Sequence, residues 1–173
     1  MIGLERGTVE LVPYQAEWKP LYEKEVAHLK AVAGERVLDF EHIGSTAIEG
    51  VPAKPIIDIL AVVEDLKDVR GFIRVLEENG YEYRPDDDVH GRLFFAKGPR
   101  TNRTHYLSLT EWESDFYHEK IAFREYLREY PEVAEQYASV KRALAQKYPK
   151  TREKYTAEKS DFIQDVLDRT MSE

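Results

Sequence analysis

Residues 56–63 constrain the fold of this chain more than any other stretch, because the run is apolar except for Asp58. A short apolar run that is rich in β-branched residues and flanked by turn residues predicts a strand buried on both faces. An unpaired carboxylate in such a strand is costly, so it needs cations, hydrogen-bond donors or a metal beside it. The run therefore predicts both a central strand and a functional site at Asp58.

The composition is that of an ordinary globular protein, and the length of 173 residues predicts one domain, 1–173, with its own core. The formal net charge of −8 argues against broad binding to nucleic acid or to anionic membranes. Cysteine is absent, which excludes disulfides and zinc–thiolate sites.

Residues 1–8 lack an apolar signal core, and no apolar run approaches the roughly 18 residues that a membrane helix needs. We therefore expect a cytoplasmic protein with no membrane partner. The sequence does not determine its oligomeric state.

The spacing of apolar residues predicts that residues 1–110 form an α/β part. Three- and four-residue spacing predicts helices from Trp18 to Gly34 and over residues 66–76, the second closed by Asn79 and Gly80. Strands are predicted over residues 8–14, 36–43, 56–63, 81–84, 92–97 and 103–109, the last two as a hairpin joined by residues 98–102.

Residues 111–173 are predicted to form a helical part packed on the α/β part. Thr110 and Glu113 have the spacing of a capping box at the start of a helix that runs to Tyr130. Pro131 suits the first position of a second helix, and Thr151 is the expected cap of a third. The fold class is therefore α/β (α+β), with three C-terminal helices.

Gly44, Ser45 and Thr46 form a turn between two predicted strands, and such a turn suits a phosphate group. Glycine lets the backbone approach a ligand closely, and exposed N–H groups beside a small hydroxyl bind phosphate oxygens. Lys54, just before the buried strand, is the best single candidate for a phosphate-binding cation. A plain tight turn is the alternative. The P-loop and G-x-G-x-x-G patterns are both absent, which disfavours the folds that carry them.

Arg124, Lys141 and Lys159 lie at helical spacing from apolar residues, so each shares the inward face of its predicted helix. Long basic side chains at such positions either snorkel to solvent or lean inward. Three inward cations on an acidic protein predict an anion-binding cleft between the helices and the sheet. Arg92 and Arg103, on the predicted hairpin strands, are weaker candidates.

Several segments closely resemble the GrpB family, which is grouped with the polymerase-beta-like nucleotidyltransferase superfold. They are residues 41–47 (EHIGSTA), 54–59 (KPIIDI), 103–107 (RTHYL), 123–128 (FREYLR), and 155–156 (YT) together with Lys159. The resemblance covers nearly the whole chain. It implies a nucleotidyltransferase-like mixed sheet flanked by helices, but it supplies no known substrate.

The superfold implies metal-assisted nucleotidyl transfer with two Mg²⁺ ions held by carboxylates. We expect a nucleoside triphosphate as donor and a small molecule as acceptor, since the net charge disfavours nucleic acid. Asp58 would be the main ligand of Mg²⁺ (or Mn²⁺), and Ser45 and Lys54 would complete the catalytic group. Residues 44–46 and the helix cations would hold the triphosphate. Active members carry Asp-x-Asp, whereas this chain has Leu60 at the second place. Glu41, or one of the acids from Asp86 to Asp88, is therefore the candidate for a further carboxylate.

His42 and His105 suggest a different metal site. Together with Asp58 they would form a ligand set for Zn²⁺, Mn²⁺ or Fe²⁺, provided that His105 faces Asp58. A core imidazole is the alternative for each histidine. The family pattern often has a second histidine three positions after His105, where this chain has Ser108.

Three functions remain open from the sequence. The first is a metal-dependent nucleotidyltransferase. The second is a catalytically degenerate module of the same fold that binds a nucleotide or another anion, as Leu60 suggests. The third is an enzyme that uses a single metal held by histidine and aspartate.

Overall fold

A computed structural model describes residues 2–171 and places the buried run in a five-stranded mixed sheet of order β1-β2-β5-β4-β3. Strand β2 (Ile57–Val63) pairs antiparallel with β1 (Asp39–Ile43) and parallel with β5 (His105–Glu111). Strand β4 (Leu93–Lys97) forms the predicted hairpin with β5, and β3 (Tyr81–Tyr83) pairs with β4. The α/β class and the central strand are confirmed.

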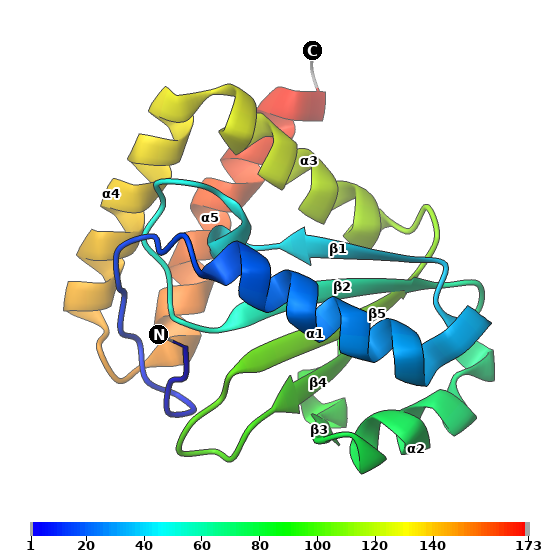
Figure 1. Cartoon of the computed structure of the whole chain (residues 1–173). Coiled ribbons are helices and arrows are strands. Elements are labelled where there is room, and N and C mark those ends of the chain that lie inside the picture. The colour runs from blue at the N-terminus through cyan, green and yellow to red at the C-terminus, as the bar shows by residue number, and fades with distance from the viewer. Residues whose placement is uncertain (1, 172–173) are drawn as a thin grey trace.

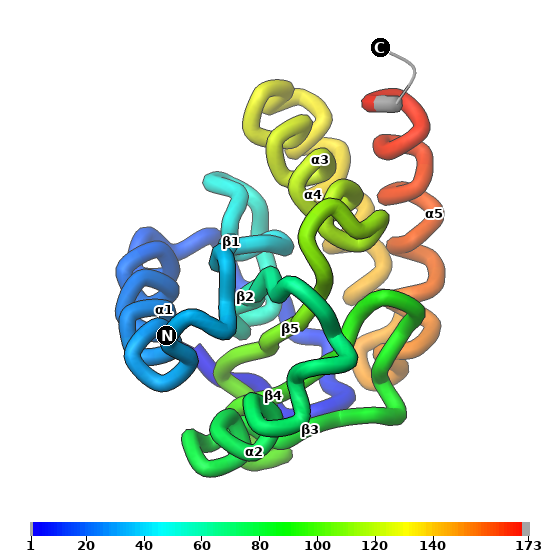
Figure 2. The backbone as a smooth tube through the Cα atoms, turned by 90° about the vertical axis from the view of Figure 1, so that its right-hand side faces the viewer, coloured from blue at the N-terminus to red at the C-terminus, as the bar shows by residue number. Residues whose placement is uncertain are grey.

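Helices cover both faces of this sheet (Figures 1 and 2). On one face lie α1 (Trp18–Ala33) and α2 (Arg70–Glu78). On the other face lie α3 (Asp115–Glu129), α4 (Pro131–Lys147) and α5 (Arg152–Met171), which are the three predicted C-terminal helices. Pro131 is the first residue of α4, as its position predicts.

Alternation along β2 decides which way Asp58 points. Successive side chains of a strand project to opposite faces of the sheet. Ile57, Ile59 and Ala61 belong to the core shared with α1 and α2. Asp58 therefore projects to the other face, toward α3, α4 and α5, whose own apolar residues form a second cluster with Ile48 and Val51.

One predicted strand is absent and another is shorter than expected. Residues 8–14 form no strand, because only Val12 pairs there, in an isolated bridge with Ala53. Strand β1 begins at Asp39, since a 3₁₀ turn over Gly34–Arg36 follows directly after α1. None of the helices in residues 2–171 combines the length and the apolar content that crossing a bilayer requires.

Helix α3 is capped by Ser114 and not by Thr110, which corrects the predicted capping box. The Ser114 Oγ accepts the Tyr117 N–H at 3.1 Å. Thr110 belongs to β5, and its Oγ1 donates to the Gly91 carbonyl at 2.6 Å. The sheet continues through Thr110, so the helix starts one turn later than the motif suggests.

The cap gives a direct test of this helix start. We expect Ser114→Ala to lower the free energy of unfolding by about 1 kcal/mol, because an orphan N–H at the start of α3 loses its partner. Urea denaturation measures the change. Ser139→Ala, at an exposed site inside α4, is the control and should change stability by less than about 0.5 kcal/mol. Equal effects of the two substitutions would contradict the assigned cap.

Candidate functional site

The turn after β1 lies against Asp58, as the sequence predicts. Gly44 has φ +72°, and a Cβ at this position would lie 3.0 Å from Asp58 Oδ2. Glycine is therefore needed both for the backbone conformation and for the close approach of the carboxylate. Ser45–Ala47 follow as a single 3₁₀ turn.

Asp58 opens into a small cavity between the sheet and the three C-terminal helices. The volume of this cavity is about 160 Å³. Four amines line it, and we call it the lysine cavity: Lys54 from the segment before β2, Lys120 from α3, Lys141 from α4 and Lys159 from α5. Ser45, Thr46, Tyr106 and Tyr137 add hydroxyl groups, and the exposed Glu119 adds a second carboxylate.

Lys141 ties helix α4 to the turn. Its Nζ donates to Ser45 Oγ at 2.6 Å and to the Pro52 carbonyl at 2.8 Å, and the residue is only 3% exposed. Two separate segments, the turn after β1 and the loop before β2, are thus held by one side chain. Lys141 builds the wall of the cavity as well as lining it.

The other charged groups of the cavity have no such partners. Within residues 2–171, no hydrogen bond or ion pair joins the side chains of Lys54, Asp58, Lys120 or Lys159 to another group. The amines of Lys120 and Lys159 lie over the rings of Phe116 and Tyr155, at 5.3 and 5.2 Å from the ring centres. A buried charge without a partner is unfavourable. Several such charges around one cavity therefore favour the binding of a ligand that supplies the missing partners.

Burial and mutual repulsion lower the pKa values of these amines. The pKa of Lys54 falls to about 7, first because it is buried and then because Lys159 and Arg152 are near. Burial also lowers the pKa of Lys120 and of Lys159, and the Asp58 carboxylate opposes this effect in both. The pKa of Lys141 lies well below its usual value for the same primary reason, burial. Burial raises the pKa of Asp58.

These residues suit an anion and do not fit a pair of Mg²⁺ ions. Mg²⁺ prefers an octahedral set of oxygen ligands. Among residues 2–171, no group of three or more acidic or histidine side chains is arranged to hold a metal ion. Asp58 faces four amines instead, and the positive charge of those that are protonated opposes a divalent cation while attracting a phosphate.

The two histidines lie on the opposite face of the sheet from Asp58, so the single-metal set of His42, Asp58 and His105 is wrong. The pairing places His42 beside Ile59 and His105 beside Ile57, both of which point toward α1. His42 stacks on Tyr22 at 4.4 Å between ring centres, and burial lowers its pKa to about 4.

His105 belongs to a buried network at that face. Its Nε2 lies 3.6 Å from Glu25 Oε2, and Glu25 also accepts hydrogen bonds from Lys97 at 2.8 Å and from Tyr81 at 3.0 Å. Glu25 fixes α1 on the sheet through these contacts. His105 is therefore a core residue of the fold and not a ligand beside Asp58.

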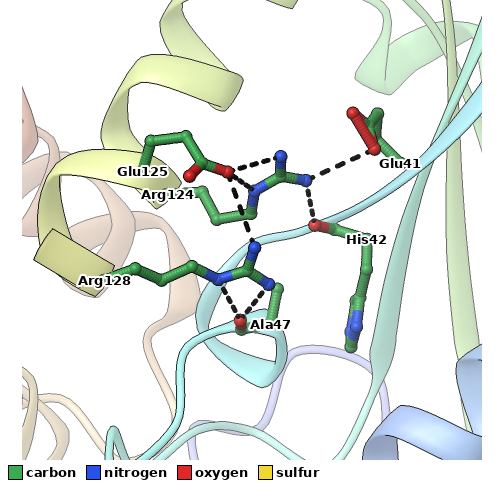
Figure 3. Close-up of polar contacts among 6 residues, drawn as sticks. All are labelled: Glu41, His42, Ala47, Arg124, Glu125 and Arg128. Atoms are coloured by element: carbon green, nitrogen blue, oxygen red, sulfur yellow. Dashed lines mark hydrogen bonds and ion pairs between the residues drawn. The ribbon is translucent and has the colours of Figure 1, made fainter.

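Arg124 does not line the lysine cavity, although the sequence predicts it there. Its guanidinium donates to the His42 carbonyl at 2.9 Å and to Glu125 at 2.7 Å, and it lies 3.6 Å from Glu41 (Figure 3). Glu41 is held by this ion pair and does not reach the cavity lining. Both residues border a larger cleft of about 880 Å³, which shares Thr46 with the lysine cavity.

Arg128 holds the turn from the side of this larger cleft. Its guanidinium donates to the Ala47 carbonyl at 2.7 and 3.1 Å (Figure 3). Lys141 binds the same turn through Ser45. The segment 44–47 is thus fixed by cations on both of its sides.

Seven of the residues predicted for the site do line the lysine cavity: Gly44, Ser45, Thr46, Lys54, Asp58, Lys141 and Lys159. The sequence analysis missed Lys120. Its signal was present, since Lys120 lies three positions before Phe123 and seven before Leu127, both buried on α3. Arg103, a weaker candidate, binds the Gly98 carbonyl at 2.6 Å and is 2% exposed, so it supports the hairpin turn.

The lowered pKa of Lys54 predicts a pH-dependent stability. Between about 7 and 10.5, the unfolded chain binds more protons at Lys54 than the folded protein does. Below pH 7, the free energy of unfolding is therefore lowered by the full cost of burying this charge. It increases as the pH rises from about 7 toward 10.5. We expect Lys54→Met to be more stable than wild type near pH 7, with a difference that shrinks toward pH 10.5.

Urea denaturation across this pH range measures the difference, and Lys150→Met at an exposed site is the control. A constant difference for Lys54→Met at all pH values would contradict the buried, uncompensated amine.

Comparisons with known proteins identify the family of this chain. The family model described as "GrpB protein" matches residues 8–169. The chain is 42% identical over 171 residues to the glutamate-rich protein GrpB of Alkalihalophilus pseudofirmus, and the match covers 96% of this chain and 98% of that protein. It is 27% identical over 192 residues to a dephospho-CoA kinase of Mycolicibacterium paratuberculosis, with 96% of this chain but 47% of that protein covered.

A solved structure has the same fold. The crystal structure of the conserved protein GrpB from Enterococcus faecalis matches with a TM-score of 0.82 and 35% identity. The match covers 92% of this chain and 98% of that one. The sequence matches and the shared fold lead to the same conclusion: the chain belongs to the GrpB family.

Proposed function

We propose that this protein binds the phosphate group of a small phosphorylated metabolite in the lysine cavity without a metal ion. The observation that carries the proposal is the set of amines without partners that converge beside Asp58. A bound phosphate would supply the missing partners, and hydrogen bonds to charged groups are worth about 1.5–3 kcal/mol each.

Asp58 has an electrostatic role in this proposal. Its carboxylate opposes the loss of protons from Lys120 and Lys159, so these two amines keep their charge for the ligand. Removing this carboxylate makes the cavity more positive. A metal-free anion site should therefore tolerate the loss of Asp58, whereas a metal site should not.

Nucleotides are one class of ligand that supplies such a phosphate. A relative carries the name dephospho-CoA kinase, although the match covers 47% of that protein. The cavity of about 160 Å³ is smaller than the roughly 300–1,000 Å³ of sites that enclose drug-sized ligands. It would hold the phosphate end of a nucleotide while the rest of the molecule extends outside.

Metal-dependent nucleotidyl transfer is the second candidate, because Asp58 lies against the Gly44–Ser45 turn as that chemistry would require. Both candidates use the same cavity, and they differ in the role of Asp58. In the transferase, Asp58 would hold Mg²⁺ or Mn²⁺, and an acceptor would bind nearby. Substitution of Asp58 therefore separates the two functions.

The test is a thermal-shift panel with pyrophosphate, ATP and dephospho-CoA, each with EDTA and with Mg²⁺. We expect stabilisation in EDTA, of about 2.7 kcal/mol for a ligand at 100 times its Kd. Lys159→Met should weaken binding about tenfold or more, since one charge-assisted contact is lost. Lys154→Met, at an exposed site of the same helix, is the matched control and should bind as wild type does.

Asp58→Asn decides between the candidates. The anion site predicts that this variant still binds pyrophosphate in EDTA, with equal or higher affinity. Binding that requires Mg²⁺ and disappears in Asp58→Asn would support the transferase and contradict the metal-free site. If none of the three ligands stabilised the wild type, both candidates would be wrong.

A further inference from the structure

We propose that Lys54 is a nucleophilic amine that forms an imine with a small phosphorylated aldehyde held in the lysine cavity. The inference rests on the proposed phosphate site and adds a covalent step to it. Its basis is a difference among the four cavity amines. Lys141 is held by two hydrogen bonds, and Lys120 and Lys159 face the Asp58 carboxylate. Lys54 also lines the cavity without a hydrogen bond, but the charges nearest to it are positive.

Lys141 is not available as a nucleophile. Its Nζ is fixed by the hydrogen bonds to Ser45 and Pro52, and it is almost fully buried. Lys120 and Lys159 are each opposed to the Asp58 carboxylate, which is the leading influence that keeps them protonated. These amines therefore serve to hold an anion.

Lys54 has the opposite surroundings. The charges that act on it are first Lys159 and Arg152, both positive, and only then Asp58. Its side chain is half-buried, lines the cavity and has no hydrogen bond or ion pair within residues 2–171. A lysine that is desolvated beside other cations loses its proton near neutral pH and becomes a nucleophile, which is how imine-forming lysines are activated.

The step balances without any oxidant or reductant. The lone pair of the neutral Lys54 Nζ attacks the aldehyde carbon, a C–N bond forms, and the carbonyl oxygen takes up a proton. Loss of the second proton from nitrogen and departure of the oxygen as water give a C=N bond. Asp58, whose pKa is raised by burial, and the ammonium groups of Lys120 and Lys159 line the same cavity and can exchange these protons.

The volume of the cavity limits the substrate class. About 160 Å³ accommodates a phosphate with a short carbon chain rather than a complete nucleotide. The phosphate would bind to Lys120, Lys141 and Lys159, and the carbonyl group would then lie toward Lys54. A phosphorylated aldehyde of a few carbon atoms fits both requirements.

The experiment uses glycolaldehyde phosphate as the probe and borohydride to trap the imine. Intact mass measures the extent of labelling, and peptide mapping identifies the lysine. We expect one adduct per chain, at Lys54, formed at least about tenfold faster than with glycolaldehyde, because the bound phosphate holds the aldehyde near the amine. The labelling rate should rise with pH above about 7, because Lys54 reacts only after it has lost its proton and the bound phosphate raises the pKa of Lys54 above its value in the free protein.

Inorganic phosphate should slow the labelling, Lys54→Arg should abolish the adduct, and Lys150→Arg should leave it unchanged. Adducts spread over exposed lysines, or placed on another cavity lysine, would overturn the assignment. The mapping on wild type decides this even if Lys54→Arg does not fold. A wild-type protein that pyrophosphate stabilises but glycolaldehyde phosphate does not label would overturn the imine while leaving the phosphate site intact.

Discussion

The contact of Lys141 with Ser45 and Pro52 is the interaction on which the candidate site depends. It joins helix α4 to the turn after β1 and to the loop before β2, which lie 96 and 89 residues before Lys141 in the sequence. Arg128 binds the same turn at the Ala47 carbonyl, and Arg124 binds the strand before it at the His42 carbonyl. Cations that donate to backbone carbonyls thus fix the wall of the cavity.

The rest of the cavity follows from how charge is distributed around Asp58. A polymerase-beta-like metal site would need a second carboxylate at Leu60, and this residue is instead fully buried in the core. The cavity contains amines from each of the helices α3, α4 and α5. In this protein, lysine side chains therefore supply the positive charge that metal ions would supply in the superfold. Such an arrangement attracts phosphate oxygens directly, and it leaves Asp58 as a regulator of the charge of its neighbours.

The sequence predicted much of the site because local patterns determine it. The buried run located β2, the Gly44–Ser45 turn lies beside Asp58, and helical spacing correctly directed Lys141 and Lys159 inward. The prediction from the same spacing was wrong for Arg124. A periodic pattern identifies the inward face of a helix, but it does not identify which residues of the sheet that face contacts. One turn of α3 separates Arg124 from Lys120, and this is enough to bring it to Glu41 at the edge of the sheet instead of to Asp58.

The position of His105 was beyond the reach of the sequence for a different reason. A register shift of one residue moves every side chain of a strand to the other face, and the register between β2 and β5 is set by long-range pairing. Ile57 pairs with His105, so this histidine joins Glu25 in the core under α1. The predicted cap of α3 at Thr110 was wrong for a similar reason, because the pairing of β5 with β2 extends through Thr110.

The measurement that tests the central claim most directly is calorimetry of pyrophosphate binding near pH 8 in buffers of different ionisation enthalpy. An anion among the cavity amines raises their pKa values, and Lys54 is largely unprotonated at this pH, so binding should take up protons from the buffer. The account predicts proton uptake that decreases in Lys54→Met. Binding with no proton exchange, in wild type and variant alike, would show that the anion does not enter the lysine cavity.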